Sequence, residues 1–166
     1  MPPPDAPVVK TIAIAAPPDA VWRVLTWPAL IVRWMSDEPL VVEADWRAGG
    51  AIRFSGVLHG LDFENRGAIT AFDPPHVFEY AYWSTLSASR LAETEANRTR
   101  VRFALAPEAG GSLLTLALRD FPEPSIRPHA ELYWGVTLGI IRDVAEGRQT
   151  SRPGPAPAGS PPARRA

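Results

Sequence analysis

The chain contains no cysteine, which excludes disulfides, a thiolate nucleophile and a cysteine-based zinc site. This absence fits a reducing compartment, and we expect a cytoplasmic location. No apolar run approaches the roughly 18 residues that a membrane-spanning helix needs, so we expect no membrane span. The first residues, MPPPDAPVVK, lack a charged start, an apolar segment and a cleavage site, so we expect no secretory signal.

Lysine is almost absent, because Lys10 is the only lysine among 17 basic residues. Together with the frequent Ala and Pro, this arginine usage is typical of a GC-rich bacterial genome. The formal net charge is −1, and residues 148–166 carry four arginines and no acid, which leaves about −5 for residues 1–147. A mildly acidic folded part argues against a nucleic-acid partner, because such a face needs clustered positive charge.

The common motifs for metals, nucleophiles and phosphates are also missing. His59, His76 and His129 are too widely spaced to form a ligand pair, and no HExxH or HxH occurs. The chain has neither a GxSxG nucleophile motif nor the GxxxxGK[ST] and GxGxxG phosphate loops. We therefore expect no metal, no cofactor and no catalytic residue.

The clearest pattern present is an amphipathic helix over 128–147. Its apolar residues recur three or four positions apart and form one continuous stripe: Ala130, Trp134, Leu138, Ile141 and Ala145. Residues 148–166 contain no large apolar side chain, so we expect a disordered Pro/Arg-rich tail there. The folded domain is therefore predicted to span 8–147.

Between these ends the pattern alternates with the period of strands. We expect a first strand over 8–15, two short helices that begin near the prolines at 17–18 and 28, a mobile loop over 84–97, and six further strands near 40–46, 50–57, 62–72, 76–84, 98–106 and 112–120. The dipeptides Gly49-Gly50 and Gly110-Gly111 are expected to supply the positive φ of tight hairpins. The sequence thus predicts an α+β domain in which a curved seven-stranded antiparallel sheet surrounds the last helix.

Strand alternation also predicts which side chains face that helix. Apolar residues share one face of each strand, as in Ile52 and Phe54, or Phe78, Tyr80 and Tyr82. The acids Asp62, Glu64 and Glu79 are expected on the solvated outer face. A register slip of one residue would turn them inward.

Five strings, in this order, resemble the AHSA-type branch of the helix-grip (START/birch-pollen-allergen-like, SRPBCC) superfamily, a branch named for an activator of a heat-shock chaperone ATPase. The matching features are Trp34, the Gly49-Gly50 pair, the turn at 73–75 and Trp134, whereas Tyr133 stands where the family usually has Gly. The resemblance implies a helix-grip fold and, as a family tendency, apolar-ligand binding or protein contacts. The strings are AAPPDAVWRVLTWPALIVRWMS (15–36), WRAGGAIRF (46–54), GAITAFDPPHVFEYAYW (67–83), TRVRFALAPEAGGSLLTL (99–116) and YWGVTLGIIRDVAEG (133–147).

Large apolar side chains on the inner face are our candidate ligand-binding residues. They are either the lining of a cavity or the filling of a core, and both alternatives stay open at this stage. Tyr80 and Tyr82 are the best indication of a cavity, because buried hydroxyls need partners. Trp22 and Trp83 are assigned to packing. The candidates are Trp34, Trp46, Phe54, Phe63, Phe78, Tyr80, Tyr82, Phe103, Leu116, Trp134, Leu138 and Ile141.

Three functions remain open. The leading hypothesis is binding of a small hydrophobic or aromatic molecule in the sheet–helix cavity, without covalent chemistry. The second is a cyclase-, lyase- or hydrolase-type enzyme, which would need a buried Asp62, Glu64 or His59 beside the aromatic residues, with His59 and Asp62 clustered at the cavity mouth. The third is a chaperone-associated or regulatory interaction module, which predicts a filled core and a large exposed apolar patch. A homodimer is a further open alternative.

Overall fold

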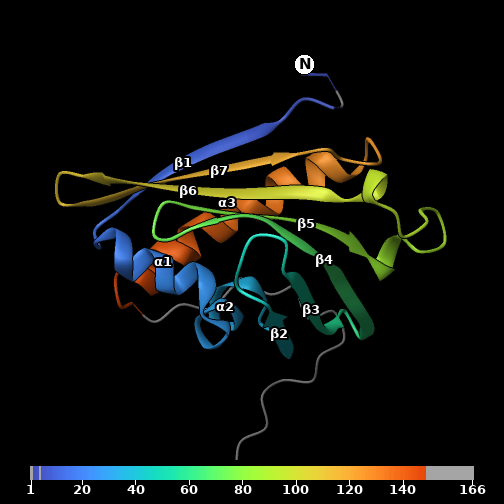
Figure 1. Ribbon diagram of the computed structural model, residues 1–166, viewed down its shortest axis with the longest axis horizontal. Coiled ribbons are helices and arrows are strands. Elements are labelled where there is room, and N and C mark those ends of the chain that lie inside the picture. Colours follow the sequence, from blue (N-terminus) through green and yellow to red (C-terminus); the bar gives the residue numbers. More distant parts are fainter. Residues whose placement is uncertain (1, 4, 149–166) are drawn as a thin grey trace, which may run out of the picture.

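The computed structural model describes residues 2–3 and 5–148, and these form the predicted α+β architecture (Figure 1). No helix of this described part is long and apolar enough to cross a membrane. The predicted tail lies outside the described residues except for Arg148, whose guanidinium group lies 2.8 Å from the carboxylate of Asp143. The elements are β1 (Val8–Ile14), α1 (Pro18–Thr26), α2 (Pro28–Met35), β2 (Leu40–Ala44), β3 (Ala51–Leu58), β4 (Leu61–Asp73), β5 (Val77–Ser84), β6 (Thr99–Glu108), β7 (Gly111–Arg119) and α3 (Ile126–Ala145), with two short 3₁₀ turns, Thr85–Ser87 and Glu95–Asn97.

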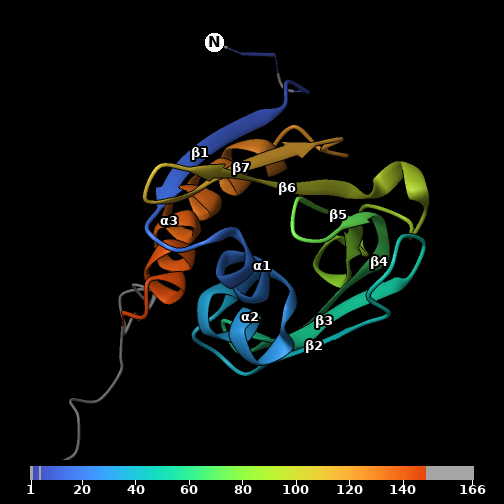
Figure 2. The same ribbon diagram turned by 60° about the vertical axis from the view of Figure 1, so that its left-hand side comes forward.

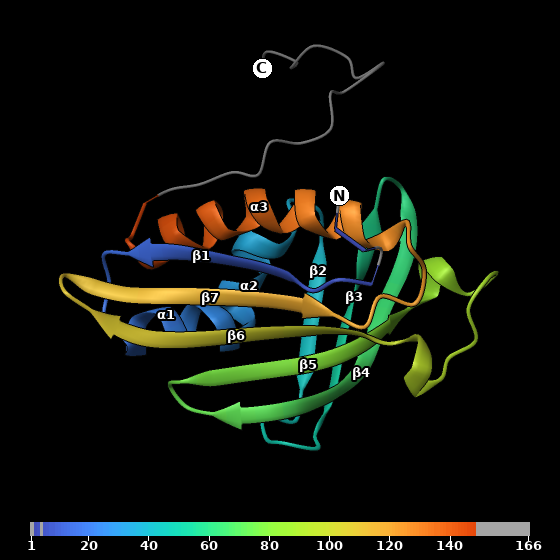
Figure 3. The same cartoon turned by 90° about the horizontal axis from the view of Figure 1, so that it is seen from above.

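The seven strands form one antiparallel sheet in the order β1-β7-β6-β5-β4-β3-β2. Figure 2 shows that this sheet curves around the helices, with β1, β7 and β6 on one side and β3 and β2 on the other. From above, α3 runs along the sheet beside β1 and β7 (Figure 3). We call the face toward the helices the inner face and the opposite face the outer face. The arrangement is the predicted helix-grip fold.

The register of the sheet places the predicted apolar residues on the inner face. Phe78 pairs with Phe103, and Tyr80 pairs with Val101, all four of which are buried. The same alternation continues into β7, where Leu114, Leu116 and Leu118 are fully buried. A bulge at Ile69–Ala71 interrupts the pairing of β4 with β5, and such a bulge bends the strand.

In each predicted turn dipeptide, the first glycine and the second glycine are favoured for different reasons. Gly49 and Gly110 have φ values of +84° and +82°, which only glycine adopts without strain. Gly50 and Gly111 lie against neighbouring backbone, where an added Cβ would come within 1.9 and 2.0 Å of a carbonyl oxygen. A side chain would therefore strain the backbone at Gly49 and Gly110, and it would clash with neighbouring backbone at Gly50 and Gly111.

Helix α3 begins at Ile126, two residues before the predicted start, and ends at Ala145. The sequence pattern predicts Pro128 as the first helical residue. It is the third, and proline is accepted there because N–H groups of the first turn have no helical partner. The buried side of α3 is wider than the predicted stripe and also includes Thr137, Ile140 and Val144.

Residues 84–97 form the predicted loop, with two 3₁₀ turns and several specific contacts. The Trp83 indole donates to the carbonyl of Leu91 at 3.0 Å, and the Asn97 amide donates to the carbonyl of Ala92 at 2.9 Å. Glu93 pairs with Arg66 at 2.6 Å. The sequence pattern did not predict these contacts, because each involves polar groups. Strand alternation indicates only which face of a strand is apolar.

Candidate ligand-binding site

A pocket of about 610 Å³ lies on the inner face, between the first half of α3 and strands β3–β5. We call it the inner pocket. Its volume falls within the range typical of small-molecule sites. Its wall is mainly apolar and aromatic, with a few polar side chains. The lining residues are Met35, Ser36, Leu40, Phe54, Leu58, Phe63, Asn65, Tyr80, Tyr82, Ser84, Leu86, Arg90, Ser125, Ile126, His129, Ala130, Tyr133 and Trp134.

Five of the candidate residues lie along this wall: Phe54, Phe63, Tyr80, Tyr82 and Trp134. They come from three adjacent strands and the facing helix, which the alternation rule places on one side. The rings of Phe54 and Tyr80 lie 5.4 Å apart, and those of Tyr80 and Tyr82 lie 6.0 Å apart. The pocket therefore offers a continuous aromatic surface to a guest.

The other seven candidates lie outside the pocket wall. Most belong to the buried core, where Trp34 packs against Trp134 and Phe103 and donates its indole N–H to the carbonyl of Val24 at 2.8 Å. Alternation indicates the face of a strand but not how closely a helix covers it, so it could not separate core from pocket wall. The seven are Trp34, Trp46, Phe78, Phe103, Leu116, Leu138 and Ile141.

The assignment of Trp22 and Trp83 to packing agrees with their positions. Trp22 is buried on α1, and its ring lies 5.4 Å from that of Phe72. Trp83 is buried on the outer face, under the guanidinium group of Arg66. Neither indole belongs to the inner pocket.

The two tyrosine hydroxyls stay protonated at physiological pH. Removal from water raises the pKa of Tyr82 to about 12, with a smaller effect from the neighbouring Tyr133. The same desolvation raises the pKa of Tyr80 well above its ordinary value of 10.0. Both hydroxyls can therefore donate a hydrogen bond to a guest, and neither can act as a general base near neutrality.

Asn65 is the most informative residue that the sequence analysis missed. Its side-chain oxygen is buried in the pocket wall and has no hydrogen-bond partner. An unpartnered buried acceptor costs free energy, and native structures contain few of them. The signal was available, since Asn65 follows Phe63 by two positions and shares its face of β4.

The sequence analysis also missed Tyr133 and the two residues at the mouth of the pocket, Arg90 and His129. The Tyr133 hydroxyl donates to the carbonyl of Met35 at 2.6 Å and so ties α3 to the end of α2 beside the pocket. His129 and Arg90 line the pocket where it meets solvent, and both are exposed. Arg90 lies 3.0 Å from Glu123, which already offsets its charge.

The ionisable groups that an enzyme would need lie outside the wall of the inner pocket. His59 and Asp62 are exposed at the turn between β3 and β4, and neither belongs to the wall of the inner pocket. Glu64 pairs with Arg66 at 3.1 Å. No carboxylate belongs to the pocket wall formed by the described residues.

Glu79 corrects a prediction, because it lies on the outer face but is not solvated. Only 4% of its side chain is exposed, beneath Arg100, Arg102 and Arg119. Burial alone would raise its pKa, but the Thr70 hydrogen bond and the Arg119 charge outweigh that and lower it below 4.5. Alternation gave the correct face, and the surrounding arginine side chains decided the burial.

Residues 2–3 and 5–148 contain no group of three or more His, Cys, Asp or Glu side chains that could hold a metal ion. His59 and His76 lie in two separate turns between strands, and His129 lies on α3. The inner pocket offers shape, aromatic surface and neutral hydrogen-bonding groups, with Arg90 and His129 at its mouth.

Solved structures share this fold at low sequence identity. A solution structure of a protein from Cytophaga hutchinsonii has a TM-score of 0.71 and 23% identity, covering 86% of this chain and 94% of that one. A crystal structure from Chromobacterium violaceum has a TM-score of 0.68 and 19% identity, covering 84% and 96%. The Aha1 dimer from Colwellia psychrerythraea, solved in solution, has a TM-score of 0.66 and 16% identity, covering 85% and 96%.

No curated protein matches the chain. The family model described as Activator of Hsp90 ATPase homolog 1-like protein matches residues 15–146, from the end of β1 to the end of α3. This range includes all of the inner pocket. The chain therefore belongs to the Activator of Hsp90 ATPase homolog 1-like family.

Proposed function

We propose that this protein binds a small, flat hydrophobic or aromatic molecule in the inner pocket, without covalent chemistry. The observation that carries the proposal is a pocket of about 610 Å³ whose wall combines five aromatic candidates with a buried, unpartnered acceptor. Aromatic walls with a few placed polar groups are typical of small-molecule sites. A core built only for stability would close such a space, because interiors are close-packed.

The polar groups of the wall define which molecules fit best. The Asn65 oxygen requires an O–H or N–H donor from the guest, and the Tyr80 and Tyr82 hydroxyls can donate to an acceptor. A phenol or a similar hydroxylated aromatic compound supplies both functions. A purely apolar guest would leave the Asn65 oxygen without a partner.

The enzymatic alternative has less support, because His59, Asp62 and Glu64 all lie outside the pocket wall. The interaction-module alternative predicted a filled interior, and the inner pocket argues against that. Its other requirement is an exposed apolar patch, and Leu132 and Val136 on α3 are exposed at 72% and 42%. These two residues are one turn apart on α3, and the other exposed large apolar side chains are Val9, Trp27, Val41, Leu61 and Leu86.

We also propose a cytoplasmic location, which the absence of cysteine supports. A homodimer remains a proposal. The Colwellia relative is a dimer, and Leu132 and Val136 give this chain an exposed apolar contact. Sedimentation velocity of the wild type and of Leu132→Glu tests it, because a dimer built on this patch should dissociate in the variant.

Calorimetric titration with naphthalene and 2-naphthol tests the ligand proposal. We expect both to bind, with dissociation constants of about 1–100 µM for molecules of this size. Since 2-naphthol can donate to Asn65, it should bind about 5- to 10-fold more tightly. Amide shifts in an NMR spectrum should fall on Phe63, Tyr82 and Ala130.

Ala130→Phe supplies the blocking variant, because it places a ring in the pocket without removing any wall residue. Leu132→Phe is the matched control on the exposed side of the same helix. Binding of both probes should vanish in the first variant and persist in the second. Absence of heat and of localised shifts with wild-type protein would remove the proposal.

A further inference from the structure

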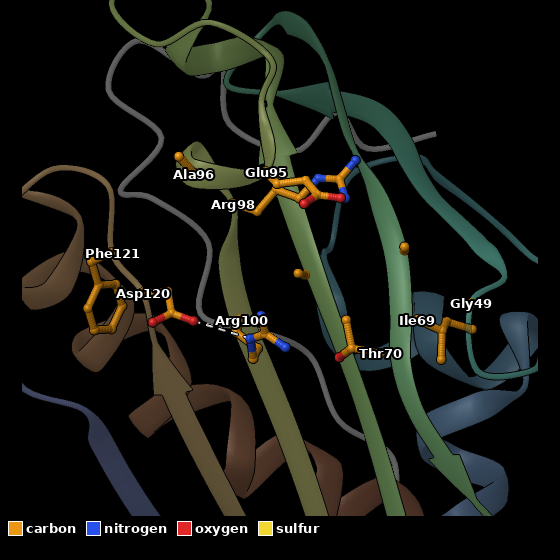
Figure 4. A pocket seen from close by; sticks show the side chains of 11 residues that line it. Gly49, Ile69, Thr70, Glu95, Ala96, Arg98, Arg100, Asp120 and Phe121 are labelled. Atoms are coloured by element: carbon orange, nitrogen blue, oxygen red, sulfur yellow. Dashed lines mark hydrogen bonds and ion pairs between the residues drawn. The ribbon is translucent and has the colours of Figure 1, made fainter.

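A second cavity lies on the outer face, across the sheet from the inner pocket. It is a groove of about 740 Å³ over β4, β5 and β6, bordered by residues 95–98 and 120–121 (Figure 4). We call it the outer groove. Unlike the inner pocket, it is lined mainly by polar groups. Its lining residues are Gly49, Ala68, Ile69, Thr70, Ala81, Glu95, Ala96, Arg98, Arg100, Asp120 and Phe121.

The groove exists because two small residues meet in register at its floor. Ala68 on β4 pairs directly with Ala81 on β5. Larger outer-face side chains stand on either side, with Arg66 over Trp83 at one end and Thr70 bonded to Glu79 at the other. Two alanines between such neighbours leave a depression with an apolar floor.

Arg98 and Arg100 line the groove together with the acids Glu95 and Asp120, and a cluster of Glu79 with three arginines lies beside it. Glu79 is held by Arg100, Arg102 and Arg119, at N–O distances of 3.4, 3.4 and 3.2 Å. Arg100 and Arg119 are direct cross-strand partners, and Glu79 supplies the counter-ion that these like charges need. One carboxylate accepts only a few hydrogen bonds, whereas each guanidinium carries several donors, so donors remain in excess here.

Arg98 gives independent support for a ligand. Its Nε–H is buried and has no hydrogen-bond partner. Figure 4 shows Arg98, which directly precedes β6, and Arg100, which lies on β6, beside the same floor, with a dashed line that joins Arg100 to Asp120. A buried guanidinium donor without an acceptor is costly, and an oxyanion is the partner that satisfies it best.

We propose that the outer groove is a second binding site, which holds a small organic anion. Its carboxylate or phosphate group contacts Arg98 and Arg100, and its apolar body rests on Ala68 and Ala81. The acids Asp120 and Glu95 at the rim repel a polyanion, so the site selects a compact molecule of low charge over nucleic acid. The volume suits a metabolite-sized ligand.

NMR titration with benzoate, phenyl phosphate and benzyl alcohol tests this site. These probes share one ring and differ in a carboxylate, a phosphate or a neutral hydroxyl. We expect both anions to shift the amides of Ala81, Arg98 and Arg100, and the neutral alcohol to leave them unchanged. Tighter binding of phenyl phosphate assigns a phosphate ligand, and tighter binding of benzoate assigns a carboxylate.

Arg98→Met keeps an unbranched apolar stem and removes the guanidinium group and its charge, so it should weaken anion binding about 10-fold or more. Arg33→Met, at an exposed position on α2, is the matched control and should have no effect. Ala68→Leu fills the floor without changing any charge and should also abolish binding. Naphthalene binding in the inner pocket should persist in all three variants.

Three results would overturn the proposal: no anion-dependent shifts, shifts that fall on the inner pocket instead, or equal affinity in the wild type and in both outer-groove variants. Added sodium chloride gives a further check, since attraction to partly exposed arginines is screened by salt. Anion affinity should fall between low and high salt, whereas naphthalene affinity should not.

Discussion

The two faces of β5 show how one strand serves two different surfaces. Tyr80 and Tyr82 belong to the aromatic wall of the inner pocket, whereas Glu79 and Ala81 belong to the charged surface of the outer face. Consecutive residues of a strand point to opposite sides, so both surfaces can change independently. The inner surface depends on shape and desolvation, and the outer surface depends on charge.

The comparison also separates two kinds of burial. On the inner face, Phe103 is enclosed by Trp34, Phe78 and Trp134. On the outer face, Glu79 is covered by the side chains of Arg100, Arg102 and Arg119, which remain partly exposed to water. The first arrangement should be sensitive to lost volume, and the second to lost charge.

The largest loss of stability is expected from a substitution on the inner face. Phe103→Ala should lower the free energy of unfolding by about 3–5 kcal/mol, because it leaves a cavity in a filled core. Phe63→Ala, which removes a ring from the pocket wall, should cost less than about 2 kcal/mol since that ring already borders open space. Urea denaturation measures both. Equal losses would mean that the pocket is closed in solution.

The second effect concerns the outer face. Glu79→Gln should destabilise the protein by about 2 kcal/mol, because three arginines lose a buried counter-charge and water compensates only part of it. Glu43→Gln is the control, since Glu43 pairs with Arg53 at a site where 57% of its side chain is exposed. That change should cost less than about 0.5 kcal/mol. Similar values for the two variants would show that Glu79 is solvated.

Acid should weaken the same outer cluster. A carboxylate whose pKa is lowered in the folded state stabilises the protein above its unfolded pKa, and this contribution disappears as the pH falls. The melting temperature should therefore drop between about pH 5 and about pH 3, and Glu79→Gln should reduce the slope. Arg66 lowers the pKa of Glu93, so Glu93 should account for part of the pH dependence that remains in the Glu79→Gln variant. A slope that is unchanged in the variant would contradict this assignment.

The smallest effect is a gain in stability. Asn65→Leu removes the unpartnered oxygen from the inner pocket, so the ligand-free protein should become more stable by about 0.5–1 kcal/mol. The same variant should lose the preference for 2-naphthol over naphthalene. Thermal melts and calorimetry measure the two changes. Lower stability together with an unchanged preference would indicate that Asn65 has a structural partner in solution.

Much of the fold could be predicted from particular residues. The stripe containing Trp134 and Leu138 indicated the last helix, and the glycine pairs at 49–50 and 110–111 indicated turns. The family resemblance placed these elements in a known order, and the family model confirms it. Boundaries were less certain, as the early start of α3 at Ile126 shows, because the first turn of a helix tolerates proline.

The sequence predicted on which face of the sheet the candidate residues lie, but not how deeply each of them is buried. Phe54 and Phe103 have the same inner-face pattern, but one lines the pocket and the other fills the core. The difference depends on where α3 and the two short helices cover the sheet. The same limitation applies to Glu79, whose burial depends on arginines from two neighbouring strands.

By itself, the sequence determined the secondary structure, the order of its elements and the face of the sheet on which most side chains lie, because these follow from local periodicity and turn chemistry. Only the tertiary structure decided where the interior stays open, which acid is buried and which polar atoms lack a partner. These properties depend on contacts between residues far apart in the chain, and no local pattern records such contacts.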